Sequence, residues 1–186
     1  MKRKTTKEIL AESFRELAAE KAIDKITVKD IAVNCGYSQA TFYRQFRDKY
    51  DLVAWDYASG LSSVMEKIGE EGYVWKQTLI DGAHGFQQDR DYLANLLRHT
   101  EGQDSFIRYM SETNFEALKR HIEKVTGSNE LPDMIVMYIR LYCLGTVSFA
   151  CEWILGKYQS SAEELAEVFL KSLPQPLHQY LLEDGE

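Results

Sequence analysis

Apolar residues recur at helical spacing along almost the whole chain. From Thr6 to Lys21, the residues Leu10, Phe14, Leu17 and Ala18 form one apolar stripe, and glutamates fill the positions between them. The same periodicity, interrupted at turn-forming residues, predicts longer helices over 49–69, 75–88, 90–99, 103–126, 131–156 and 161–183. No segment has the alternation of a strand, so the pattern predicts an all-α fold of about nine helices.

A short helix is predicted directly after residue 26. Thr27 and Asp30 have the spacing of a capping box, and Ile26 and Ile31 have that of a hydrophobic staple. Gly36 follows the last apolar position and is suited to end the helix. The sequence therefore predicts an independently capped helix of two turns.

A second short helix should follow within a few residues. Ser38 is a suitable N-cap, and Phe42 and Phe46 point to one side of the helix that it begins. Asp48 can then cap the helix at 49–69. Two short helices separated by a glycine-containing turn, after a supporting first helix, describe a helix-turn-helix.

The outer face of this second short helix has the composition of a surface that meets nucleic acid. It carries, at positions away from the two phenylalanines, Gln39, Ala40, Tyr43 and Arg44. No Asp or Glu occurs between residues 35 and 47. Such a face can enter the negative potential of a DNA groove.

The net charge of −7 argues against DNA binding until the chain is divided. Residues 1–50 contain eleven Lys or Arg and seven Asp or Glu, a net charge of +4, whereas residues 51–186 have eleven and twenty-two, a net charge of −11. This asymmetry predicts a basic DNA-binding domain at 1–50 and an acidic helical domain at 51–186. Lys2, Arg3 and Lys4 are candidates for an arm along DNA or for a solubilising tail.

Catalytic and metal-binding patterns do not emerge. The three cysteines have no metal-ligand spacing, and we interpret them as free thiols. Nucleophile, zinc and phosphate-loop motifs are missing, so we expect neither an enzyme nor a bound cofactor or metal. The apolar stretch at 131–155 contains three charged residues, and no apolar core follows the basic N-terminus. We therefore expect a cytoplasmic protein without a membrane segment.

At this point the residues carry a family resemblance. The chain resembles the TetR family of transcriptional regulators over residues 6–53, on the residues Thr27-Val28-Lys29-Asp30-Ile31-Ala32, Cys35-Gly36-Tyr37-Ser38-Gln39-Ala40-Thr41-Phe42-Tyr43-Arg44-Gln45-Phe46 and Lys49-Tyr50-Asp51-Leu52. Tyr37 replaces a small aliphatic residue and Ala40 a glycine of the family pattern, which leaves the docking angle on DNA open. The run at 96–106 and the aromatic helix at 138–153 resemble the subgroup of dihydroxyacetone kinase regulators.

The resemblance implies a division of labour within the predicted helix-turn-helix. Thr27, Thr41, Tyr43 and Lys49 would hold the phosphate backbone. Gln39 and Arg44 would read base edges, because Gln can pair with adenine and Arg with guanine through two hydrogen bonds. Ser38 and Ala40 complete the set expected to lie at the DNA.

A homodimer is expected because one short recognition helix reads too few bases, and two helices can enter successive major grooves of a palindromic operator. The resemblance implies pairing of the last two helices across the dimer. Candidates for this interface, or alternatively for the core of one chain, are Leu165, Val168, Phe169, Ser172 and Leu173 with Ile135, Tyr138, Leu141, Tyr142 and Leu144.

The central helices would enclose an effector pocket in most members of the family. Candidates for its lining, each of which could equally be ordinary core, are Trp55, Trp75, His84, Arg98, His99, Phe106, Tyr109 and His121. The effector could be a small molecule or, as the subgroup implies, a partner protein. It would act by shifting the helix at 49–69. The main rival interpretation is a helical adaptor that keeps the fold and binds protein instead of DNA.

Overall fold

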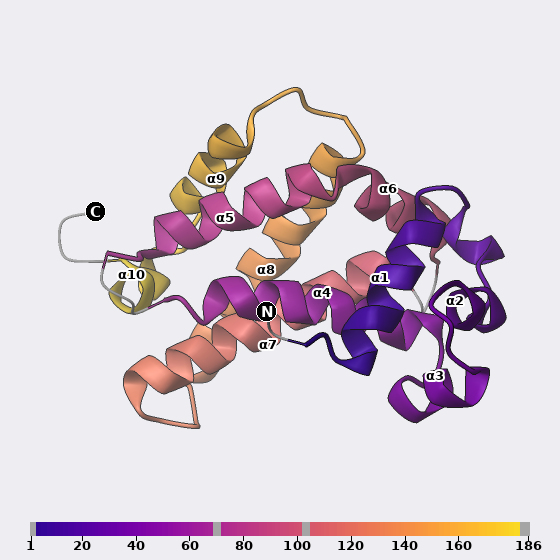
Figure 1. The fold of residues 1–186 in the computed structure, drawn as a ribbon. Helices are drawn as coiled ribbons and strands as arrows, with labels where there is room; N and C mark the ends of the chain where they lie inside the picture. Colours follow the sequence, from indigo (N-terminus) through magenta and orange to yellow (C-terminus); the bar gives the residue numbers. More distant parts are fainter. Residues whose placement is uncertain (1–2, 69–71, 102–104, 183–186) are drawn as a thin grey trace.

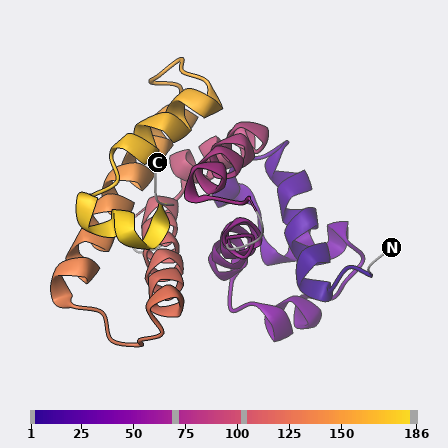
Figure 2. The same cartoon turned by 90° about the vertical axis from the view of Figure 1, so that its left-hand side faces the viewer.

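The computed structural model describes residues 3–68, 72–101 and 105–182. Within these ranges every regular element is a helix, as the apolar periodicity predicts. The first three α-helices and one 3-10 helix lie at one end of the molecule, and α4 (Lys49–Met65) runs from this end across the middle into the part formed by the later helices (Figures 1 and 2).

The N-terminal unit consists of short helices, and each of its three α-helices has an N-cap side chain. Its elements are α1 (Thr6–Ala18), the 3-10 helix η1 (Ile23–Lys25), α2 (Val28–Asn34) and α3 (Gln39–Gln45). The predicted capping box is present, because Thr27 accepts a hydrogen bond from the backbone of Asp30 and the Asp30 side chain accepts one from the backbone of Thr27. Ser38 caps α3 by accepting a hydrogen bond from the backbone of Thr41.

The remaining helices have between 7 and 22 residues. They are α4 (Lys49–Met65), α5 (Trp75–Gln88), α6 (Arg90–His99), α7 (Phe106–Thr126), α8 (Asp133–Ile154), α9 (Ala162–Lys171) and α10 (Gln175–Leu181). Asp48 caps α4 as predicted, with hydrogen bonds from the backbone of Tyr50 and Asp51. α5 packs against α9, and α8 packs against both α7 and α6.

Several predicted helix boundaries need correction. α1 ends at Ala18 instead of Lys21, because the chain turns there. The side-chain amide of Asn95 donates hydrogen bonds to the carbonyl oxygens of Ala18 and Lys21. α4 ends at Met65 and does not reach residue 69, which lies outside the described residues, as does the predicted start of a helix at 103. The segment 161–183 forms two helices, α9 and α10. Pro174 lies at their junction and lacks the N–H that a continuous helix needs.

The hydrophobic core does not stop at the expected domain boundary near residue 50. One cluster of buried residues includes Phe14 and Phe42 of the N-terminal helices together with Phe106, Trp153 and Phe169 of the later ones. A second cluster lies between α5, α7, α8 and α10. The N-terminal helices are therefore packed on the rest of the chain. A shift of helices in one part can displace side chains in the other, because the shared core is close-packed.

α8 is the most apolar helix among the described residues. By length and composition it could cross a membrane, with a mean hydropathy of 1.6 in its most apolar window, of which 39% is buried inside the chain. Its buried side carries Ile139, Val147 and Trp153, and its other side exposes Met137 and Leu141. Half of this helix therefore packs in the core, and the other half presents an apolar face.

Candidate functional site

α3 is held in place by its two phenylalanines. Phe42 and Phe46 are buried, with ring centroids 5.8 Å apart, and Phe46 lies 5.7 Å from the ring of Trp55 on α4. Lys7 of α1 places its ammonium over the Phe46 and Trp55 rings. This packing fixes which side of α3 faces solvent.

The outward side of α3 carries the four residues expected to meet DNA. Gln39, Ala40 and Arg44 are exposed, and 57% of Tyr43 is accessible. Within the described part of the chain, Arg44 makes neither a hydrogen bond nor an ion pair. The face is thus free of carboxylates and keeps its donors available, and it lies at the edge of the molecule formed by α1–α3 (Figure 1).

The hydroxyl groups at the two helix starts already serve as caps. Thr27 Oγ1 donates to a carboxylate oxygen of Asp30 at 2.8 Å, and the hydroxyls of Ser38 and Thr41 lie 3.0 Å apart. These residues remain at the exposed N-termini of α2 and α3, where backbone N–H groups favour phosphate. Their expected contacts with DNA stay predictions.

Lys49 has a structural role that the sequence does not reveal. Its ammonium donates to the carbonyl oxygens of Ile23 and Ile26 at 2.8 Å and of Asp24 at 3.1 Å. Burial lowers the pKa of this ammonium. In this conformation all three donors are used to hold the turn that precedes α2, and the phosphate contact expected of Lys49 remains a prediction beside that role.

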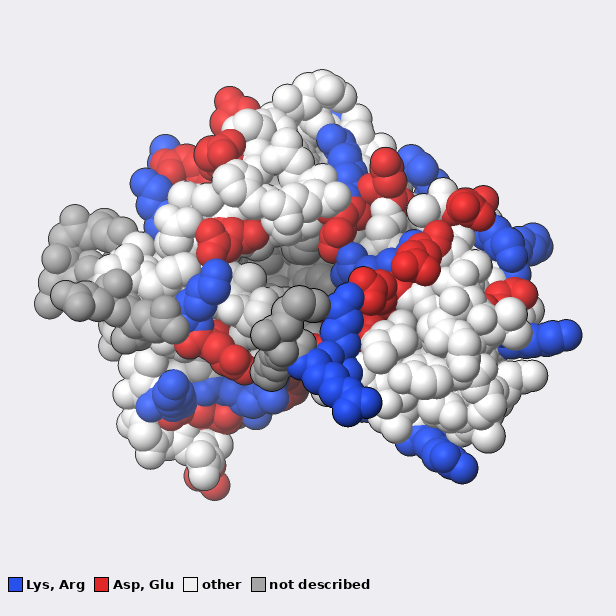
Figure 3. Space-filling view, viewed as in Figure 1, with Lys and Arg blue, Asp and Glu red and all other residues white. Residues whose placement is uncertain are grey.

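The expected N-terminal arm is only partly described. Lys2 lies outside the described residues, and Lys4 is paired with Glu12 at 2.7 Å. Figure 3 shows Lys and Arg side chains projecting around the end formed by α1–α3, with some acidic side chains among them, and both signs mixed over the rest of this view.

Two polar side chains join the N-terminal unit to the later helices. Asn95 of α6 donates to the carbonyl oxygens of Ala18 and Lys21, each at 2.8 Å, and accepts from the Ile23 backbone at 3.2 Å. Arg15 of α1 donates to Asp56 of α4 at 2.8 Å and to Asp89 at 2.6 Å. The N-terminal unit of α1, η1, α2 and α3, called the reading unit below, is thus bonded to α6 and to the α5–α6 junction as well as to α4.

A cavity of about 320 Å³ opens among α4, α5, α7 and α8. Its wall is mainly apolar and aromatic, including Tyr57, Phe86, Phe106 and Phe169. The surface is hollowed between α4 and α5 in Figure 3. This size and lining are those of a small-molecule site, for which volumes of roughly 300–1,000 Å³ are usual.

Both parts of the chain match families of regulators. Residues 9–54 match the family described as "Bacterial regulatory proteins, tetR family", and residues 74–175 match that described as "Transcriptional regulator C-terminal region". This chain belongs to the TetR family. The helix-turn-helix and the helical domain expected from the sequence are therefore those of a TetR regulator.

Solved structures of TetR regulators have the same fold. The dihydroxyacetone kinase operon activator DhaS has a TM-score of 0.66 at 17% identity, covering 95% of this chain and 98% of its own. A TetR regulator from Streptococcus agalactiae 2603V has a TM-score of 0.62 at 17% identity, covering 91% and 94%. Thermus thermophilus FadR, solved with lauroyl-CoA, has a TM-score of 0.60 at 18% identity, covering 96% of each chain. No curated protein sequence matches this chain.

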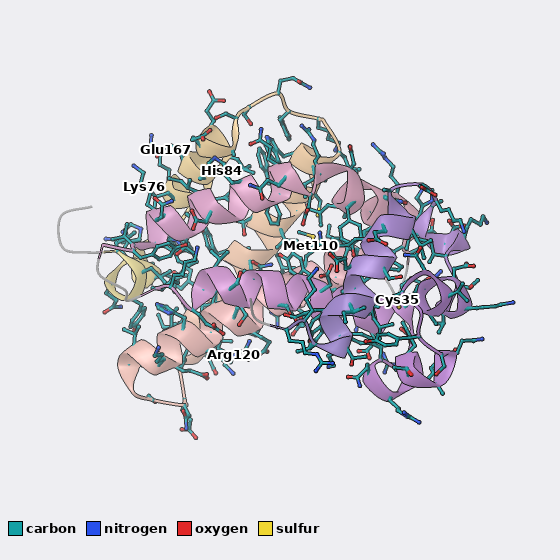
Figure 4. All side chains as sticks on the ribbon, viewed as in Figure 1. Cys35, Lys76, His84, Met110, Arg120 and Glu167 are labelled. Carbon is teal, nitrogen blue, oxygen red and sulfur yellow. The ribbon has the colours of Figure 1, made fainter. Side chains whose placement is uncertain are left out.

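Of the eight residues expected to line a pocket of this TetR regulator, two line the cavity. Trp75 and Phe106 are buried in its wall. The other six are not among the residues that line this cavity, and their part in an effector site stays a prediction. Trp55 packs on Phe46, His84 lies 2.7 Å from Glu163, His99 lies 3.7 Å from Asp24, Arg98 is exposed, and Tyr109 and His121 occupy other positions on α7. Figure 4 shows His84 and Lys76 on α5 along its junction with α9, which carries Glu167.

Helical spacing alone could not separate the candidates that line the cavity from those that do not. It predicts which side of a helix a residue lies on but not which helix packs against that side. The cavity residues missed from the sequence are mostly on α4 and α5, such as Tyr57, Leu79 and Phe86. Arg15 was missed because it lies in the N-terminal unit. Only packing of α1 against α4 and α6 brings it to the cavity.

The residues expected at a dimer interface divide into two sets. Leu165, Phe169, Leu173, Ile135 and Tyr142 are buried inside this TetR chain, whereas Val168, Leu141, Leu144 and Ser172 are exposed. Tyr138, of the same set, is half-buried. The buried residues belong to the core of one chain, and the dimer interface stays a prediction for the exposed ones. The exposed set, with Met134 and Met137, forms one apolar face on α8 and α9.

The cysteine thiols are unpaired. Cys143 and Cys151 are buried, and burial raises the pKa of each thiol to about 12. Cys151 lies 3.8 Å from the sulfur of Met110, which is labelled in the interior in Figure 4. These thiols pack as small apolar groups. Among the described residues no cluster of three or more His, Cys, Asp or Glu could hold a metal ion.

Proposed function

We propose that this chain is a sequence-specific DNA-binding regulator that binds a palindromic operator as a homodimer and is controlled by an effector. The observation that carries the proposal is the outward face of α3, where exposed Tyr43 and Arg44 stand without a neighbouring carboxylate. Arg44 has no internal partner within the described ranges, so its guanidinium can bind a base edge without first breaking an ion pair.

Within this face the residues divide by chemistry. Arg44 and Gln39 are the base-reading residues, because both can make paired hydrogen bonds to a purine edge. Tyr43 and Thr41 contact the phosphate backbone through hydroxyl groups, with Ser38 and Thr27 at the helix starts. Ala40 allows the backbone of α3 to approach the groove closely.

The homodimer would form through the apolar face on α8 and α9. Leu141 is 67% exposed and Met137 64%, and both lie on the same side of α8 as Leu144. Contiguous apolar surface of this kind on a soluble protein marks an interaction site. Pairing with a second copy explains why α8 is apolar almost all round in a cytoplasmic regulator, without placing it in a membrane.

The effector would occupy the cavity. Its wall includes Arg15 of α1 and Tyr57 of α4, so a ligand there touches elements that set the position of α3. The structure of FadR with lauroyl-CoA is a case of ligand binding in a related fold. A protein effector, as the resemblance to the dihydroxyacetone kinase regulators implies, would instead bind the outer surface.

Selection of bound sequences from a random pool of double-stranded DNA tests the proposal. We expect enrichment of a palindrome whose half-sites are about one helical turn, or a multiple of it, apart. An electrophoretic mobility shift should then give a specific complex with two chains per site.

The Arg44→Ala variant should bind the same pool with weaker selection. Failure of the native chain to enrich any sequence, together with retained folding, would favour the rival adaptor function.

A further inference from the structure

Four charged or polar side chains form one cluster in the cavity wall, and one of them belongs to the DNA-reading unit. Arg15 of α1 pairs with Asp56 of α4 at 2.8 Å and with Asp89, at the end of α5, at 2.6 Å. Tyr92 of α6 donates to Asp56 at 3.2 Å, and its ring lies 4.5 Å from the Arg15 guanidinium. All four residues line the cavity.

The charges in the wall do not balance. The described lining has three carboxylates, on Asp56, Asp81 and Asp89, and one cation, Arg15. Lys67, outside the wall, pairs with Asp81 at 3.1 Å and offsets part of the excess. The Arg15 cluster itself keeps one carboxylate more than it has cations. Inside a partly enclosed cavity this excess attracts a cation and repels an anion more strongly than it would in water.

A second observation also points to a ligand. Trp75 lines the cavity and is only 5% exposed, and its indole N–H lies near the Tyr142 hydroxyl without reaching full hydrogen-bond geometry. The nearby Tyr142 hydroxyl donates its own proton to the carbonyl oxygen of Phe169 at 2.9 Å. A buried donor that is only partly satisfied is costly in a native structure, which makes it a position where a ligand atom would be stabilising.

The aromatic rings of the wall suit the same kind of ligand. Tyr92 contacts the charged cluster, and Tyr57, Phe106 and Phe86 belong to the same wall. Aromatic faces attract ammonium groups, and quaternary ammonium ions are recognised in cages of such rings. An apolar chain attached to the ammonium would fill the rest of the cavity.

We propose that the cavity binds an organic cation with an apolar body, whose charged group lies at Asp56 and Asp89 and competes there with Arg15. This inference names the ligand class of the effector site and rests on the proposed function. Because Arg15 links α1 to both carboxylates, a cation that takes over these contacts loosens the reading unit from the α5–α6 junction. The ligand-bound dimer then binds its operator more weakly.

Binding of three probes with the same apolar chain tests the ligand class. Octyltrimethylammonium, octanol and octanoate are titrated separately into the full-length protein, without DNA, in a calorimeter. We expect the cation to bind about tenfold more tightly than the alcohol, which corresponds to 1.4 kcal/mol, and octanoate to bind most weakly. Equal or tighter binding of octanoate, or no binding of the cation, would overturn the proposal.

Matched variants locate the charged group. Asp89→Asn should weaken binding of the cation several-fold and leave octanol unchanged. Asp91→Asn is the control, because Asp91 is exposed on α6 two residues away and is not part of the wall. If Asp89→Asn fails to fold, Asp56→Asn removes the other carboxylate to which the cation is assigned and should give the same selective loss. Equal loss for all three probes, or loss in the control alone, would contradict the assignment.

Operator affinity with and without octyltrimethylammonium tests the coupling. The cation should raise the operator Kd of the native chain, and by reciprocity the operator should weaken binding of the cation by the same factor. Arg15→Gln should reduce this mutual effect. If the cation leaves the operator Kd of the native chain unchanged, the link through Arg15 is overturned. Operator binding by the ligand-free protein is measured separately, so a failure of the DNA-binding proposal is distinguishable from a failure of the ligand class.

Discussion

The ammonium of Lys49 donates a 2.8 Å hydrogen bond to the carbonyl oxygen of Ile26, which joins the start of α4 to the residue before the N-cap of α2. Two further carbonyl oxygens, of Ile23 and Asp24, accept from the same ammonium. One side chain thus satisfies the backbone of the turn between α1 and α2 and fixes α4 against the reading unit.

Replacement of Lys49 by Met should therefore destabilise the fold. The apolar stem is retained, but three carbonyl oxygens lose their donor, so we expect the free energy of unfolding to fall by about 1–3 kcal/mol. Urea denaturation followed by circular dichroism measures this change. Lys29→Met is the control, because Lys29 is exposed on α2. A stability equal to that of the control would mean that these bonds contribute nothing, and any loss of DNA binding would then come from phosphate contact alone.

Arg44→Ala should relax sequence preference at one base position in each half-site. A bidentate arginine–guanine contact contributes about 1–3 kcal/mol of discrimination against other bases. Repeating the random-pool selection with the variant measures the change position by position. Arg47 is exposed but lies after α3 and is paired with Asp48 at 3.4 Å, so Arg47→Ala should leave the preference intact. Uniform weakening at every position in Arg44→Ala would assign that residue to phosphate instead.

Leu141→Asp should convert the protein from dimer to monomer. The side chain is 67% exposed at the centre of the apolar face on α8 and α9, and a carboxylate there would be buried unpaired in a dimer. Sedimentation equilibrium gives the mass. Val125 of α7 is comparably exposed but lies away from this face, so Val125→Asp should remain dimeric. A dimeric Leu141→Asp protein would place the interface elsewhere.

His121 should make the protein less stable as the pH falls. Burial lowers the pKa of its imidazole, with a further lowering from Lys124, so the folded chain binds this proton less readily than the unfolded chain. The unfolded state then takes up more protons below about pH 6.5, and stability decreases as the pH falls through that value. His121→Asn should show a smaller drop in Tm between about pH 7.5 and pH 5.5. Parallel curves for the variant and the native chain would refute this role.

The sequence determined the local structure of the reading unit because its signals are local. Thr27 with Asp30, and Ser38 with Thr41, interact within one helical turn, so their spacing alone predicts the caps that the structure contains. Phe42 and Phe46 fall on one side of a helix by periodicity, which leaves Gln39, Tyr43 and Arg44 outside. The family and the all-helical fold follow from the same short-range pattern.

Contacts between distant parts of the chain were decided only by tertiary structure. Lys49 pairs with carbonyl groups 23 to 26 positions earlier, Asn95 holds the end of α1 from 74 and 77 positions away, and Arg15 reaches Asp89 across 74. Periodicity states which side of a helix is apolar but not which helix covers it. For that reason Trp75 and Trp55 looked alike in the sequence, yet the first lines the cavity and the second packs on Phe46, and no residue of α1 was expected to form part of the cavity wall.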